Sequence, residues 1–223
     1  MIGKTAARIA TFLGVVLLIA TTPALAGVIA GSAHDFSTGP SAGWSGGRIC
    51  VACHTPHNAN TSVSSAALWN HTVSTAAYTM YSSTTMRAAT GTAPGASSKL
   101  CLSCHDGTIA VDSFGGRVGS TNISTANNVG IDLSNDHPIG ITYDSTTATA
   151  NGSLFDPAAH AVTIGTGTQT KTGSIASTLL YGGQLECSSC HDVHNTFTVG
   201  GLGTGMIKMS GAGSAICMAC HNK

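Results

Sequence analysis

The sequence predicts a mostly irregular fold, with short helices at four repeated motifs, a few short strands and a core that side chains alone do not fill. Two observations indicate this fold class. The 223 residues include 28 glycines, whereas only 5% are aromatic and 8% are charged, so an ordinary aromatic and aliphatic core has little material. Eight cysteines and ten histidines, by contrast, are more than packing alone would require. We therefore expect those two residue types to determine the function.

The charge balance excludes one class of partner. Nine basic residues balance nine acidic ones, so the formal net charge at pH 7 is zero. A nucleic-acid-binding surface would need a basic excess, and no nucleic-acid partner is expected.

Residues 1–26 have the layout of a secretory signal peptide. Two basic residues precede an apolar run over 9–20, and an Ala-Leu-Ala string ends at Ala26. The alternative is a membrane anchor, but a bilayer-spanning helix needs about 20 apolar residues and this run is shorter. We expect cleavage after Ala26, which leaves 27–223 as one exported domain without a transmembrane segment. The expected location is secreted, extracellular or at the cell surface, with the periplasm as the alternative.

The cysteines form four Cys-x-x-Cys pairs, and a histidine follows each pair: CVACH, CLSCH, CSSCH and CMACH. CxxCH is the attachment signature of c-type haem. Two cysteines one helical turn apart can each bond a porphyrin vinyl group, and the adjoining histidine can bind the iron. Structural disulfides and a zinc ribbon are the alternatives, but neither explains a histidine after every pair. The sequence therefore predicts four haem c groups, which would fill the core of a multihaem cytochrome c fold.

The residues predicted to hold these groups follow from the motif. The thioether-forming cysteines are Cys50, Cys53, Cys101, Cys104, Cys187, Cys190, Cys217 and Cys220. The proximal iron ligands are His54, His105, His191 and His221. Six histidines remain for the four opposite iron positions, so the supply exceeds the demand and bis-histidine iron is favoured over methionine ligation.

Local sequence separates the six candidates. His57 and His194 lie three residues beyond a proximal histidine, and we expect each to face a neighbouring haem. His137 directly precedes Pro138, which rigidifies the segment and disfavours helix. His34 lies near the start of the exported chain, on an arm long enough to reach either its own domain or a neighbouring molecule. The candidates that their neighbours constrain least are His71 and His160.

Short helices are expected at the attachment strings, notably over 98–105 and 213–222. The stretch over 115–183 is rich in small and polar residues, which in an ordinary domain would indicate disorder; here we expect it to wrap the porphyrins. Within it the sequence predicts short strands over 139–143 and 161–164 and turns at 151–152 and 182–183. Without haem, the chain is expected to be unfolded.

Strings along nearly the whole exported length carry a resemblance to a known family: HDFS, CVACHTPHNA, LWNH, CLSCHDGT, LSNDHPIG, CSSCHDVHN and the terminal CMACH. They resemble the doubled-CxxCH multihaem c-type cytochromes, and within these the extracellular tetrahaem cytochromes of the OmcE type, which polymerise into conductive filaments in metal-reducing bacteria. The resemblance implies that a histidine from a neighbouring subunit completes one haem, without indicating which; His34 is our first candidate. It also implies four distal ligands, His34, His57, His137 and His194, with His71 as first reserve and His160 as second.

Three functions are consistent with this pattern. Six-coordinate irons have no open position for a substrate, which favours electron transfer over catalysis. The first hypothesis is a subunit of an extracellular conductive cytochrome filament, a homopolymer that takes electrons from periplasmic or outer-membrane cytochromes and passes them to extracellular acceptors. The second is a monomeric periplasmic electron shuttle. The third is a multihaem oxyanion reductase, which would need one five-coordinate haem.

Overall fold

The computed structural model describes residues 28–64, 66–89, 91–200 and 205–223, and the predicted signal peptide at 1–26 lies outside these residues. Helices and strands within them are few and short. In chain order they are η1 (Gly39–Ser41), α1 (Ala42–Ser45), α2 (Ala96–His105), η2 (Thr125–Asn127), β1 (Ile141–Thr142), α3 (Ser145–Asn151), β2 (Ala161–Thr166), β3 (Gln169–Ser174), α4 (Ile175–Thr178), β4 (Gln184–Leu185), α5 (Cys187–Cys190), η3 (Ala212–Ser214) and α6 (Ala215–Met218).

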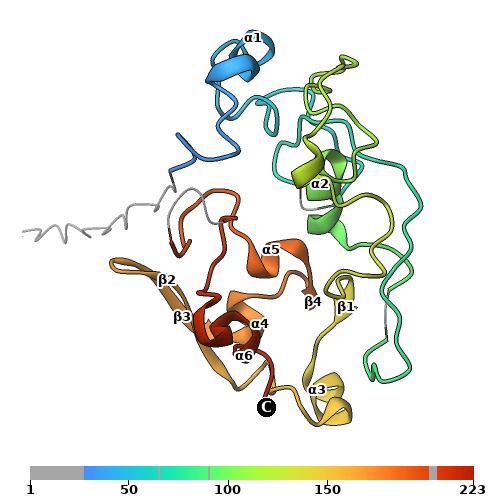
Figure 1. Cartoon of the computed structure of the whole chain (residues 1–223), viewed down its shortest axis with the longest axis vertical. Helices are drawn as coiled ribbons and strands as arrows, with labels where there is room; N and C mark the ends of the chain where they lie inside the picture. The colour runs from blue at the N-terminus through green and yellow to red at the C-terminus, as the bar shows by residue number, and fades with distance from the viewer. Residues whose placement is uncertain (1–27, 65, 90, 201–204) are drawn as a thin grey trace, which may run out of the picture.

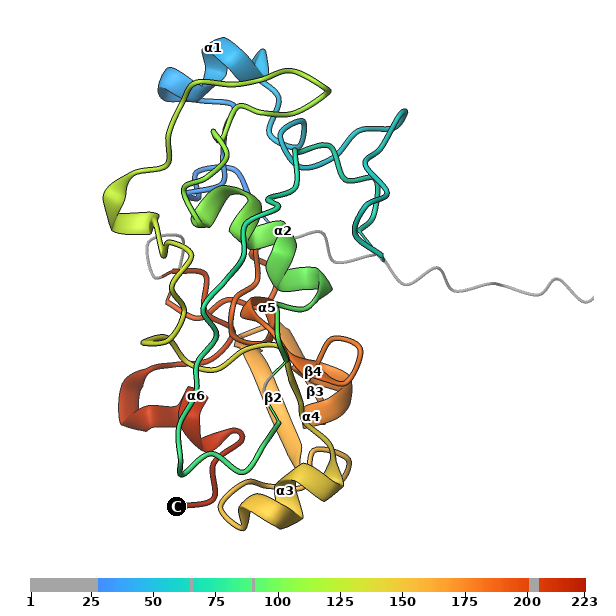
Figure 2. The same cartoon turned by 90° about the vertical axis from the view of Figure 1, so that its right-hand side faces the viewer.

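The molecule is elongated, with α1 at one end and α3 at the other (Figures 1 and 2). In both views α2 and α5 lie between these ends, where α2 packs against α5. Irregular segments run along most of the remaining length. Within the described part of the chain, no helix has the length and apolar character needed to cross a membrane.

The hairpin of β2 and β3 is the longest regular sheet. Its antiparallel register runs from Ala161 opposite Ser174 to Thr166 opposite Gln169, so a two-residue loop joins the strands. Gly167 in that loop has a φ of +60°, which glycine adopts without strain. The predicted strand over 161–164 thus forms part of β2. The predicted strand over 139–143 shrinks to the two residues of β1, because the left-handed Gly140 interrupts the extended backbone just before it.

Helix at the attachment strings is less extensive than predicted. Only α2 spans a complete CxxCH string. The predicted helix over 213–222 is cut short, because Gly213 and Ser214 have left-handed backbones and α6 ends at Met218. At the first string the prediction of a helix is wrong: His54 N donates to Cys50 O at 2.8 Å in a single turn, and Pro56 disfavours helical backbone in the residue before it.

A small aliphatic core in the C-terminal half was not foreseen. Seven buried side chains from β2, α4 and the neighbouring segments form it: Tyr143, Ala148, Val162, Ile164, Ile175, Leu179 and Ala219. Helix α3 contributes Ala148 to this core and was also missed, although both of its end signals stand in the sequence. Asp144 accepts a hydrogen bond from Thr147 N at 2.7 Å at one end, and Gly152 closes the other end in the left-handed conformation.

Candidate functional site

All eight cysteines are free thiols, so the structure does not show the disulfide framework that was one alternative. It likewise shows no cluster of three or more histidine, cysteine, aspartate or glutamate side chains able to hold a metal ion among the described residues. A zinc ribbon would require such a cluster. Iron held in a porphyrin requires only two protein ligands, one on each side.

Three of the four attachment histidines share one hydrogen-bonding pattern. The Nδ1 atoms of His54, His105 and His191 lie 2.7, 2.8 and 2.6 Å from the carbonyl oxygens of Ala67, Asn127 and Gly205, respectively. A carbonyl can only accept, so Nδ1 carries the proton in each ring. In the neutral form of such a ring, the other nitrogen, Nε2, is unprotonated and can coordinate a metal, in the arrangement by which haem and zinc proteins orient their histidine ligands.

Three attachment histidines face a second histidine from a distant part of the chain. His54 and His194 have ring centres 6.1 Å apart, and the separation is 6.0 Å for His105 and His34 and 6.5 Å for His221 and His137. Two metal–nitrogen bonds of about 2 Å, plus the distance from each nitrogen to its ring centre, give roughly 6 Å. The three pairs therefore have the spacing of two imidazoles on opposite sides of one metal ion.

A direct ring stack in the same structure has a different geometry. The rings of His160 and Phe155 lie 3.7 Å apart with planes 7° from parallel, which is van der Waals contact with no room for an atom between them. His160 is thus a packing residue here and not paired with an attachment histidine. His71, the other reserve candidate, is 1% exposed, and its two ring nitrogens lie 2.8 and 3.1 Å from the carbonyl oxygens of Thr72 and Ala110. Neither reserve residue is paired with an attachment histidine among the described residues, although the Nε2 atom of His71 lies 3.5 Å from the Sγ atom of Cys104 in the second string.

The environment of His34 keeps its ring neutral. Burial and then the nearby rings of His105, His191 and His194 together lower the pKa of His34 to about 4. Burial and then the neighbouring His137 also lower the pKa of His221. A histidine must be unprotonated to coordinate a metal, so both shifts suit a ligand role.

One attachment histidine and one predicted distal histidine remain. Within the described residues, no ring contact joins His191 to another histidine, and none involves His57. Both residues are exposed. His57 was expected to face a neighbouring haem, but this chain brings it to no attachment histidine. His34 was our first candidate to cross a subunit boundary, but it lies against His105 of its own chain because its segment folds back.

The attachment strings lie next to one another in chain order. Cys53 is close enough to Cys104 to raise its pKa, although burial is the larger cause of that rise to about 12. A hydrogen bond between the Cys101 and Cys187 thiols raises the pKa of Cys101 and lowers that of Cys187 to about 7. Burial and then Cys190 raise the pKa of Cys220 to about 12. These interactions between thiols place the first string near the second, the second near the third and the third near the fourth.

Glu186 fixes the junction between the second and third strings. Its side chain is 2% exposed and accepts hydrogen bonds from the backbone N–H and the hydroxyl of Ser98 in α2. The Ser98 hydroxyl oxygen in turn accepts from Cys187 N at 3.0 Å, and Glu186 forms a capping box with Ser189 at the start of α5. Sequence reasoning missed this role. The available signal was the only glutamate of the chain standing directly before a CxxCH string.

No protein-family model matches this chain, and no curated protein was found to be similar to it. The resemblance to a family therefore rests on the short strings alone and is not supported by a matching family model or curated protein.

Proposed function

We propose that this protein transfers electrons through four covalently bound c-type haems. The three histidine pairs, each with ring centres 6.0 to 6.5 Å apart and each including the histidine of a CxxCH string, are the observation that carries the proposal. The eight free thiols beside them supply the attachment chemistry. The pairs that would hold iron are His54 with His194, His105 with His34, and His221 with His137.

Bound haem iron would supply a one-electron redox centre. The residues of this chain would hold three of the four irons from both sides, which leaves no position for a substrate at those three. Carbonyl oxygens at three attachment histidines would fix the rings, and the linked order of the four strings would keep neighbouring centres close. The pattern at 1–26, which resembles a signal peptide, supports export from the cytoplasm. Haem is attached to such strings after export.

We further propose that the protein assembles into a filament in which His57 completes the coordination of His191 in a neighbouring subunit. Both residues are exposed, and neither has a histidine partner among the described residues of its own chain. One chain thus offers an attachment histidine without a partner and a ligand without an attachment site. A head-to-tail contact between copies satisfies both and repeats without closing.

A reductase is the second candidate, and the same His191 favours it. If no subunit supplied a ligand opposite His191, its iron would keep one open position for a small substrate. Neither a monomeric shuttle nor a reductase would form filaments. Measurements of assembly therefore need to be combined with measurements of ligand binding.

The test compares the secreted holoprotein with its His57→Ala and His160→Ala variants. Haem content by pyridine haemochromogen, particle size by light scattering, and carbon monoxide binding after full reduction are measured for each. The proposal predicts four haems in all three proteins, and filaments in the wild type and His160→Ala. It predicts dispersed His57→Ala protein that binds about one equivalent of carbon monoxide. A monomeric wild type that binds carbon monoxide would favour the reductase, and a protein without haem would refute the whole proposal.

A further inference from the structure

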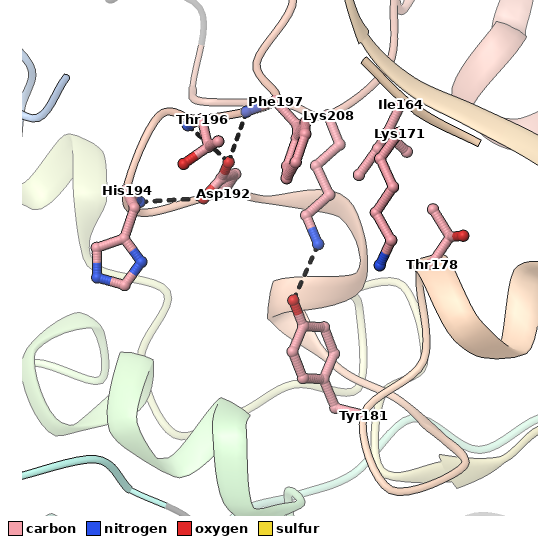
Figure 3. Close-up of a pocket in the computed structure, with 9 residues that line it drawn as sticks. All are labelled: Ile164, Lys171, Thr178, Tyr181, Asp192, His194, Thr196, Phe197 and Lys208. Atoms are coloured by element: carbon pink, nitrogen blue, oxygen red, sulfur yellow. Dashed lines mark hydrogen bonds between the residues drawn. The ribbon is translucent and has the colours of Figure 1, made fainter. Parts of the chain in front are cut away.

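A pocket of about 210 Å³ lies beside the third attachment string, between the β2–β3 hairpin and Tyr181 (Figure 3). This volume is below the range of about 300 to 1,000 Å³ found for most small-molecule sites, so it suits a small group. Two lysine side chains enter the pocket. Both lysines, Lys171 and Lys208, line the pocket, and in Figure 3 their side chains extend in the same direction.

Lys208 is a buried cation with no counter-charge in contact. It is 4% exposed, and its Nζ donates to the Tyr181 hydroxyl oxygen at 3.0 Å and to Ser188 O at 2.6 Å. An ammonium has three N–H groups, so one has no acceptor among the described residues. The single ion pair within those residues joins Arg117 to Asp112 and does not involve Lys208.

Among the described residues, no carboxylate lies within ion-pair distance of Lys208. Asp192 lines the pocket, but its carboxylate oxygens accept the backbone N–H groups of residues 194, 196 and 197 and form no ion pair in that part of the chain. Lys171 adds a second positive charge, and its ammonium donates to Ser177 O at 3.0 Å. Burying an ammonium is costly unless an anion or a full set of hydrogen bonds compensates it.

The pocket is also rigidly built. Lys208 N donates to Cys190 O at 2.8 Å, and Lys208 O accepts from Gly165 N at 2.9 Å. These bonds tie the Lys208 backbone to both the third attachment string and β2. The Tyr181 hydroxyl accepts from Lys208 and keeps its own O–H free to donate to a group bound in the pocket.

We propose that Lys208, Tyr181 and Lys171 form an oxyanion site, and that its ligand is either a carboxylate side chain of a porphyrin or a free anion such as phosphate. His194 lines the same pocket and faces His54, which brings the site next to a proposed iron position. The porphyrin source rests on the proposed function, whereas the oxyanion site does not. A carboxylate held here would be neutralised, which would raise the reduction potential of its haem.

The experiment compares the oxidised holoprotein with Lys208→Met, Lys208→Arg and Arg87→Met. Arg87→Met is the control for the loss of one positive charge at an exposed position away from the pocket. Haem content is determined first. Haem carboxylates labelled with ¹³C are then followed by redox difference infrared spectroscopy, and inorganic phosphate is titrated by calorimetry.

If a porphyrin carboxylate is the ligand, Lys208→Met shifts a labelled band. It also lowers the reduction equilibrium constant of one haem about tenfold, which is about 59 mV for one electron. Lys208→Arg keeps the wild-type band, and phosphate does not bind. If a free oxyanion is the ligand, phosphate binds the wild type one to one, and Lys208→Met binds it at least tenfold more weakly.

If all four haems are present, Lys208→Met shifts no labelled band and phosphate does not bind the wild type, the oxyanion site is refuted. If Lys208→Met does not fold, Tyr181→Phe decides instead, since it removes one donor to the anion and leaves the lysine charge in place; a labelled band and phosphate binding both unchanged in Tyr181→Phe would then refute the site. Absence of haem with intact phosphate binding would refute the proposed function and leave the oxyanion site standing.

Discussion

The rings of His54 and His194 face each other with centres 6.1 Å apart and planes 20° from parallel. His54 belongs to the first attachment string, and His194 lies just beyond the third. This pair therefore lies at a junction between the two halves of the chain. A metal between the rings would add two strong bonds to that junction.

Replacing His194 should open one iron without removing its haem. We expect His194→Ala to retain four haems, to gain one high-spin haem, and to bind about one extra equivalent of carbon monoxide when reduced. Added imidazole should restore the low-spin spectrum. The control is His160→Ala, which also loses a histidine but should leave every haem low-spin. An unchanged spectrum in His194→Ala would show that His194 is not a ligand.

Attachment stoichiometry gives a second prediction. Intact mass of the exported protein should exceed the polypeptide by four haems, and Cys101→Ala should reduce the number of haems held by two thioether bonds from four to three. Ser103→Ala alters the same string but no attachment atom, so it should keep all four. Equal haem content and thioether count in both variants would argue against attachment at the second string.

The local parts of the site could be predicted from sequence, and the long-range parts could not. The cysteines and attachment histidines follow from contiguous strings. The partner of each histidine does not, because His34, His137 and His194 reach their partners through irregular segments whose course no periodicity encodes. Only the folded chain distinguishes His71 from His34: the His71 ring nitrogens lie against two carbonyl oxygens, whereas the His34 ring lies 6.0 Å from that of His105.

Part of the fold was predictable and overlooked. Asp144 and Gly152 are ordinary helix-end signals and enclose α3. The aliphatic cluster around Ile175 was harder to predict, because its members come from short segments separated by polar stretches. At the first string a helix was predicted and is absent. The motif suggests helical geometry there, but residues 51–53 form only a turn, and Pro56 disfavours helical backbone in the residue before it.

Glu186 should stabilise the contact between the second and third strings. Glu186→Ala leaves the backbone N–H of Ser98 without its acceptor and removes the cap of α5, which should lower the free energy of unfolding by about 1 to 3 kcal/mol. Glu186→Gln keeps an acceptor oxygen and should lose less. Denaturant unfolding of the holoprotein measures both, and an unfolding midpoint unchanged in Glu186→Ala would contradict this role.

Asp112 gives a prediction for acid stability. Burial alone would raise its pKa, but hydrogen bonds from Thr121 and neighbouring backbone N–H groups outweigh burial and lower the pKa below its ordinary value of 3.8. A carboxyl whose pKa is lower in the folded state than in the unfolded state stabilises the protein at any pH above its unfolded-state pKa. This stabilisation is lost as the pH falls through the folded-state pKa. Asp112→Asn should therefore be less stable than the wild type at pH 7, with the difference shrinking below about pH 4. Thermal unfolding of both proteins between pH 3 and 7 tests this, and a difference independent of pH would contradict it.

The final prediction separates His34 from His57. His34 faces His105 at 6.0 Å within its own chain and is kept neutral by burial, whereas His57 is exposed and has no ring partner among the described residues. His34→Ala should thus change one haem to high spin while filaments still form, because the contact between subunits does not use it. His57→Ala should also change one haem but should disperse the protein. Imaging and light scattering of the two variants at equal haem content distinguish these outcomes. Dispersed His34→Ala protein together with intact His57→Ala filaments would assign the bridge to His34, and the arm before Cys50 would then have to reach a neighbour instead of folding back.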